Sequence, residues 1–158
     1  MKNTKHLILS VFGLALMMWL LGSCTSTKMA THDPYSYQKT KEIKARTSRL
    51  MDKASEPFDG HRQEAESLLS EVDEMVTYEK NRPNNEISNE MWQLLADENR
   101  FLLAGFIKKW KENERFSKAF LQEAKSQIID AMDALLSFEE KKDAKTKESL
   151  QRVIRTNQ

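Results

Sequence analysis

Apolar residues recur at steps of three or four along most of this chain, and this spacing constrains the fold more than any other feature. Steps of three or four place side chains on one face of an α-helix, whereas a half-buried strand needs strict alternation. The chain also has only 4 glycines and 3 prolines in 158 residues, which leaves little material for the turns of a sandwich or barrel. The sequence therefore predicts an all-α protein.

Four amphipathic helices are expected, at about 36–55, 61–81, 88–110 and 116–138. The clearest apolar stripe lies in the second of them and comprises Ala65, Leu68, Leu69, Val72, Met75 and Val76. One helix over 88–138 would be about 76 Å long, too long for a compact domain to bury, so a break is expected near Asn113. The segment 82–85 (RPNN) is the clearest loop. Short connections between four such helices favour an up-and-down antiparallel bundle.

The first 23 residues have the features of a secretory signal. Lys2 and Lys5 precede a largely apolar run, 7–21, which is shorter than the roughly 20 residues that a membrane-spanning helix needs. No cluster of basic residues follows this run, as a stop-transfer segment would require. Residues 1–23 are therefore expected to be a cleaved signal peptide.

The only cysteine follows this run directly, in the tetrapeptide Leu21-Gly22-Ser23-Cys24. It resembles the lipobox of bacterial lipoproteins, in which a leucine and two small residues precede an invariant lipid-accepting cysteine. The resemblance implies cleavage between Ser23 and Cys24, a diacylglyceryl thioether on Cys24, and commonly a further acyl chain such as palmitate on its amine. Two or more chains anchor firmly, because each buried methylene contributes about 0.8 kcal/mol. The resemblance covers only the signal and Cys24 and implies nothing about the mature domain.

Localisation is also inferred from this resemblance. Thr25 follows the cysteine, and in such lipoproteins the absence of aspartate there favours the outer membrane of a double-membraned cell. No acidic run of the kind that leads some lipoproteins to the cell surface follows Cys24, so the periplasmic face is expected. Residues 24–34 are then a lipidated flexible tether, 35–140 the helical bundle and 141–158 a basic polar tail of net charge +4. Nucleic acid is not an expected partner for an exported protein.

Charge is distributed unevenly along the mature chain. Residues 34–55 carry a net +4, residues 56–98 a net −9 and residues 99–158 a net +4. The acidic second helix is expected beside the basic first one, where exposed ion pairs contribute about 0–1 kcal/mol each. Five acidic residues of the second helix are candidates for binding a basic partner: Glu64, Glu66, Glu71, Asp73 and Glu74.

The mature chain has two histidines, His32 and His61, and no sequence pattern typical of catalysis. A bundle di-iron site needs Glu-x-x-His units and a c-type haem needs Cys-x-x-Cys-His, and the sequence has neither. It also has no Gly-rich phosphate loop, nucleophile elbow or zinc pattern. His61 with Met51 or Met75 is the one haem pair to consider, but methionine at helical spacing is more often core. No cofactor is therefore expected beyond the lipid on Cys24, and the chain is not expected to be an enzyme.

Three functions remain open on the sequence. The leading interpretation is a lipid-anchored, non-catalytic interaction or structural module of the bacterial cell envelope, with an envelope protein as partner. The first alternative is an inhibitor or immunity lipoprotein that binds an exported enzyme or toxin through the acidic helix. The second is a carrier of small apolar ligands or haem inside the bundle.

Overall fold

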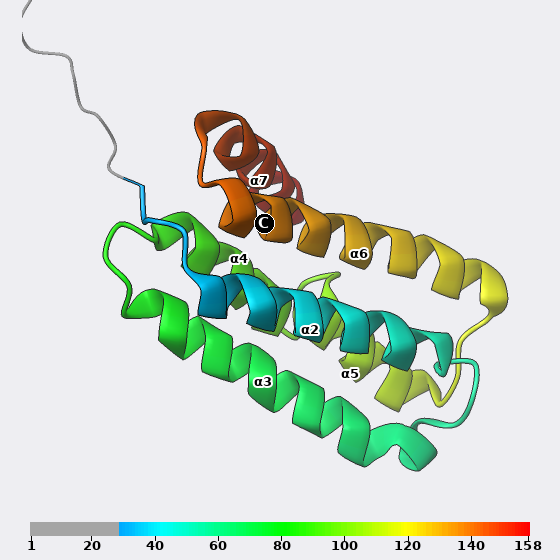
Figure 1. The fold of residues 1–158 in the computed structure, drawn as a ribbon. Helices are drawn as coiled ribbons and strands as arrows, with labels where there is room; N and C mark the ends of the chain where they lie inside the picture. Colours follow the sequence, from blue (N-terminus) through cyan, green and yellow to red (C-terminus); the bar gives the residue numbers. More distant parts are fainter. Residues whose placement is uncertain (1–28) are drawn as a thin grey trace, which may run out of the picture.

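The structure is a computed structural model that describes residues 29–158, so the signal segment, the lipobox and Cys24 lie outside the described residues. The described chain forms six α-helices and one short 3-10 helix (Figure 1). Their bounds are α2 Pro34–Asp52, η1 Phe58–His61, α3 Arg62–Lys80, α4 Glu86–Ala96, α5 Leu103–Asn113, α6 Lys118–Lys141 and α7 Ala144–Asn157. This part of the protein is all-α, as the apolar spacing predicted, but it has six helices where about four were expected.

The helices pack around one apolar core. α2 contacts both α3 and α6, α3 packs against α4, and α7 contacts α4 and α6, while the shorter α5 lies against α4 and η1 (Figure 1). Large side chains fill the centre, and each buried one contributes about 1.5–3 kcal/mol relative to exposure. The largest of them are Trp92, Trp110, Phe58 and Phe138. The apolar stripes of separate helices therefore share a single interior.

The expected helix 88–110 is interrupted at 97–102, which separates α4 from α5. The Asp97 carboxylate accepts hydrogen bonds from the Asn99 backbone N–H at 2.8 Å and from the Asn99 side chain at 3.2 Å. Such local side-chain bonds compete with the hydrogen bonds of a helix. The expectation of one continuous helix was therefore wrong here. The break expected near Asn113 is confirmed, because α5 ends at that residue.

The C-terminal segment is part of the bundle, and the expectation of a polar tail over 141–158 was wrong. α7 buries Leu150 and Ile154 almost completely, at 0% and 3% exposure. Asp143 caps the helix, since its side chain accepts from the Thr146 backbone N–H at 2.8 Å. A few apolar residues at helical spacing suffice here because most helical stability in proteins comes from tertiary packing.

Candidate functional site

Residues 29–33, here called the entry segment, lie against the end of the bundle where α3 and α6 finish (Figure 1). Hydrogen bonds to the folded domain hold this segment, among them the Ala30 N–H to the Asn84 carbonyl at 2.9 Å, Arg82 to the Thr31 carbonyl at 2.9 Å, and His32 Nδ1 to the Glu139 carbonyl at 2.7 Å. A flexible tether was expected over 24–34, and its part from residue 29 onward is instead bound to the domain.

Next to the entry segment lie four charged side chains, Glu79, Arg82, Glu139 and Lys142, here called the charged cluster. Glu79 and Glu139 are almost fully buried, at 1% and 0% exposure. Arg82 Nη1 lies 2.8 Å from Glu79 Oε2 and 3.6 Å from Glu139 Oε2, and Lys142 Nζ lies 2.7 Å from Glu139 Oε1. Burying an ion costs several kcal/mol, which only close pairing and further hydrogen bonds offset. The cluster therefore joins the C-terminal ends of α3 and α6.

The two glutamates of the charged cluster have matching surroundings. Glu79 accepts a hydrogen bond from the Ser36 hydroxyl, and Glu139 accepts one from the Ser88 hydroxyl. Each serine is the third residue of its helix, α2 or α4. A carboxylate near a helix N-terminus is stabilised by the helix dipole, typically by about 0.3–1 kcal/mol. Each glutamate thus links the end of one helix to the start of another.

The charged cluster was not expected from the sequence, although a signal for it is present there. Glu-x-x-Arg ends α3 and Glu-x-x-Lys ends α6, with the residues of each pattern three positions apart. Asp-x-x-Ser spans the start of α2, and Asn-x-x-Ser spans the start of α4. These patterns resemble ordinary exposed helix ends until the ends are known to meet, so charge alone favoured a solvated surface.

The environment of the charged cluster shifts the ionisation of its members. Burial raises the pKa of Glu79, and the negative charge of Glu139 acts in the same direction. Burial lowers the pKa of Lys142, although Glu139 opposes this effect. Beside the cluster, the Tyr78 hydroxyl donates to the Asp33 carboxylate, which raises the pKa of Tyr78 to about 12. Burial thus favours the uncharged forms of Glu79 and Lys142.

Replacing Glu79 with glutamine should change how stability depends on pH. A carboxyl whose pKa is raised by folding binds more protons in the folded state, so its contribution to stability falls as pH rises above the ordinary value of 4.5. Glu79→Gln removes this titration. The melting temperature of the variant minus that of wild type should therefore increase between about pH 4.5 and pH 7. Thermal unfolding followed by circular dichroism measures this difference in melting temperature at each pH.

Glu66→Gln, at an exposed position of α3, is the control. Its difference from wild type should stay flat over the same pH range. A flat difference for Glu79→Gln would contradict the prediction.

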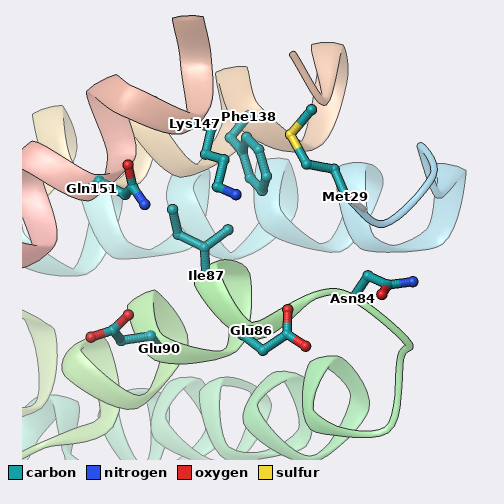
Figure 2. A pocket seen from close by; sticks show the side chains of 8 residues that line it. All are labelled: Met29, Asn84, Glu86, Ile87, Glu90, Phe138, Lys147 and Gln151. Atoms are coloured by element: carbon teal, nitrogen blue, oxygen red, sulfur yellow. The ribbon is translucent and has the colours of Figure 1, made fainter. Parts of the chain in front are cut away.

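A cleft of about 440 Å³ lies beside the entry segment, between α4 and α7 (Figure 2). Its volume is within the range of about 300–1,000 Å³ that small-molecule sites occupy. Its lining combines apolar and charged groups: Met29, Ile87 and Phe138 with Glu86, Glu90 and Lys147. Sites for apolar ligands are mostly hydrophobic, so the charges in this lining do not favour the alternative of a carrier of apolar ligands.

His61, Met51 and Met75, the residues of the possible haem pairs, have other partners in the structure. His61 stacks on Trp110 with ring centroids 5.6 Å apart, and its Nε2 lies 2.9 Å from a carboxylate oxygen of Glu56. Met51 and Met75 are buried members of the hydrophobic core. His61 is thus engaged by Glu56 and Trp110, and the two methionines serve packing.

Acidic α3 lies beside basic α2, as the charge distribution predicted, and two of the five candidate binding residues are used in this contact. Glu64 Oε2 lies 2.7 Å from Lys53 Nζ, and Glu71 is paired with Arg46. Arg46 and Lys53 both belong to the segment 34–55, whose net charge is +4. Glu64 and Glu71 therefore bind within the chain and are less available to another protein.

The other three candidates face solvent. Glu66, Asp73 and Glu74 are exposed on α3. Glu66 lies 4.0 Å from Arg62, whereas Asp73 and Glu74 form no ion pair with the described residues. Asp73 and Glu74 share a shallow cleft with Tyr35, a residue that remains 47% exposed. An acidic surface with an exposed aromatic ring is therefore present on the α2 and α3 side.

Among residues 29–158, no group of three or more His, Cys, Asp or Glu side chains is placed to hold a metal ion. In the same part of the chain, no helix is both long and apolar enough to cross a membrane. Comparison with models of protein families, with curated proteins and with solved structures found no match.

Proposed function

We propose that this chain is a lipid-anchored, non-catalytic interaction module of the bacterial cell envelope, attached through Cys24 to the periplasmic face of the outer membrane. The observation that carries the proposal is how soon after Cys24 the chain is bound to the folded domain. Residue 29 already belongs to the entry segment, and the chain from Cys24 to residue 29 spans at most about 17 Å when fully extended. An anchor on Cys24 would hold this end of the bundle close to the headgroups.

The charged cluster supports this arrangement. Arg82 and Lys142 are turned inward to buried glutamates, with side chains 14% and 5% exposed, so they are not free to bind anionic headgroups. Arg82 also donates to Thr31 of the entry segment. The cluster thus fastens the segment that follows the anchor to the folded domain. The sides of the helices remain for contact with an envelope protein.

A second candidate is an inhibitor or immunity lipoprotein, and the exposed Asp73 and Glu74 favour it. Two carboxylates without an ion pair among the described residues suit a basic surface on an exported enzyme or toxin. Such a complex would form one to one and weaken with salt, because exposed charges are screened beyond about 8 Å at physiological ionic strength. The anchor would be the same in both functions.

The anchor is tested by Cys24→Ala. Wild type is expected to incorporate labelled palmitate and to sediment with the outer membrane, because its acyl chains bury many methylenes at about 0.8 kcal/mol each. The variant lacks the acceptor thiol, so it should carry no label and should be lost from the outer-membrane fraction. Metabolic labelling, density-gradient fractionation and the mass of the N-terminal peptide measure these outcomes.

Ser26→Ala is the matched control and should behave as wild type. An unlabelled wild type, or equal outer-membrane shares for both chains, would refute the anchor.

A further inference from the structure

Two exposed phenylalanines line the same pocket on the α5 and α6 side of the protein. Phe101 is 67% exposed and Phe120 is 41% exposed, and both line a pocket of about 90 Å³ together with Phe106 and Ile128. We call it the aromatic pocket. It is smaller than the roughly 300–1,000 Å³ of small-molecule sites, so it has room for one side chain. Apolar groups left exposed together on a folded protein commonly mark an interaction surface.

The aromatic pocket has basic surroundings. Lys109 lines it, and its Nζ lies 4.1 Å from the centroid of the Phe101 ring. Residues 100–118 carry a net charge of +4, and Lys111, Arg115 and Lys118 among them are exposed. Glu123 is the acidic residue of the lining. A partner that is aromatic and acidic matches this pocket in both shape and charge.

The chain itself presents such a partner surface. Tyr35 is the remaining large hydrophobic side chain exposed in the described part of the chain. Its ring packs against Tyr78 with centroids 4.7 Å apart, and it shares a shallow cleft with Asp73 and Glu74. We call Tyr35, Asp73 and Glu74 the acidic knob. The acidic knob carries an exposed aromatic ring that can enter the aromatic pocket and two carboxylates that can face its basic surroundings.

The acidic knob and the aromatic pocket lie toward opposite ends of the bundle. Tyr35 follows the entry segment, which contacts Glu139 near the C-terminal end of α6. Phe120 stands near the start of α6, about 28 Å along the helix from Glu139 at roughly 1.5 Å per residue. A single copy cannot join the two surfaces, and a contact between them repeats from one copy to the next.

We propose that copies of this chain associate head to tail, with Tyr35 of one copy in the aromatic pocket of the next. Asp73 and Glu74 then lie against Lys109 of the neighbouring copy. The inference rests on the proposed function for its setting, because anchoring through Cys24 confines the copies to one surface and raises their effective concentration. The interface is heterologous, so it builds rows along the membrane instead of closed dimers.

Cross-linking between two differently tagged full-length copies in native membranes tests the interface. One copy carries Thr77→Cys in the cleft of the acidic knob, and the other carries Gln127→Cys in the lining of the aromatic pocket. A short bismaleimide should join a Thr77→Cys copy to a Gln127→Cys copy (unlike copies) at least about tenfold more often than it joins two copies with the same cysteine (like copies). Only the unlike copies bring a cysteine at the acidic knob next to a cysteine at the aromatic pocket. Cells that express the chain without added cysteines report any background from Cys24. Tyr35→Ala on the first copy should remove the cross-link.

Charge exchange makes the test specific to this contact. Asp73→Lys with Glu74→Lys on the first copy should lower the yield about tenfold, since like charges then face each other. Lys109→Glu on the second copy should restore the yield. Glu66→Lys, at an exposed position nearer the start of α3, is the matched control and should leave the yield unchanged.

Other outcomes overturn the inference. Equal cross-linking of like and unlike copies would show a symmetric contact, and cross-linking to a different envelope protein alone would assign the pocket to that protein. No cross-link at all would also overturn it. Palmitate labelling of the same cells separates the two proposals, because labelled protein without cross-links contradicts only this inference. Cross-links in unlabelled protein would contradict only the anchor.

Discussion

Arg82→Met is expected to lower the free energy of unfolding by about 3–5 kcal/mol, because it leaves two buried carboxylates without their shared counter-charge. Arg82 lies 2.8 Å from Glu79, 3.6 Å from Glu139 and 3.4 Å from Asp33. Methionine retains much of the aliphatic volume but none of the charge. Glu79 and Glu139 would then repel each other inside the protein, with Lys142 as the remaining cation of the charged cluster. Urea unfolding followed by circular dichroism measures the loss.

Two further variants make this result specific to the buried charge. Arg62→Met removes an arginine whose partners Asp59 and Glu66 are exposed, so its expected cost is within about 1 kcal/mol. Arg82→Met combined with Glu79→Gln should recover part of the loss, because the uncompensated carboxylate is removed as well. A loss below about 1 kcal/mol for Arg82→Met would show that solvent, and not Arg82, balances the glutamates.

Gly105→Ala is expected to cost about 3 kcal/mol, at the upper end of the usual range for overpacking. A Cβ at this position would stand 1.7 Å from the Arg100 carbonyl oxygen. That oxygen belongs to the backbone of the turn between α4 and α5, so it cannot move aside as a flexible side chain could. The turn or the start of α5 must shift, and the buried Leu102 and Leu103 would shift with it. Urea unfolding again gives the magnitude.

The matched control for this substitution is Gly60→Ala in η1. A Cβ there meets nothing within 4 Å, and the described glycines have no positive φ. The control should be neutral or should stabilise by up to about 1 kcal/mol, because alanine reduces the entropy of the unfolded chain. Equal effects of the two substitutions would mean that the contact with Arg100 does not constrain the α4–α5 turn.

Several features of the fold could be predicted from local sequence alone. The all-α class followed from the spacing of apolar residues, and the loop at 82–85 followed from Pro83 and its neighbouring asparagines. The break near Asn113 followed from the length of helix that a compact domain can bury. The pairing of α2 with α3 followed from opposite charges along neighbouring stretches of chain. Each of these depends on residues close together in the sequence.

The remaining features needed the tertiary structure. The break at 97–102 depends on the hydrogen bonds from Asn99 to Asp97 and on the close approach of the Arg100 backbone to Gly105, which the apolar spacing over 88–110 does not indicate. α7 is held by the burial of Leu150 and Ile154 against other helices. The aromatic pocket likewise joins Phe101, before α5, to Phe120 on α6. The spacing of Leu150, Val153 and Ile154 indicates only a short helical turn, and the other contacts leave no periodic pattern in the chain.

The charged cluster shows most clearly the difference between what the sequence determines and what the tertiary structure decides. In the sequence, Glu79 and Glu139 are two of 24 acidic residues, and charge alone predicts a solvated position for each. Their burial follows from the meeting of the ends of α3 and α6 with the starts of α2 and α4. Periodicity and turn residues act locally, so the sequence by itself determined the all-α class and most of the helical stretches between 36 and 138, but neither the break at 97–102 nor the extent of α7. The cost of burying a charge depends on every group packed around it, so only the tertiary structure decided which charges lie inside.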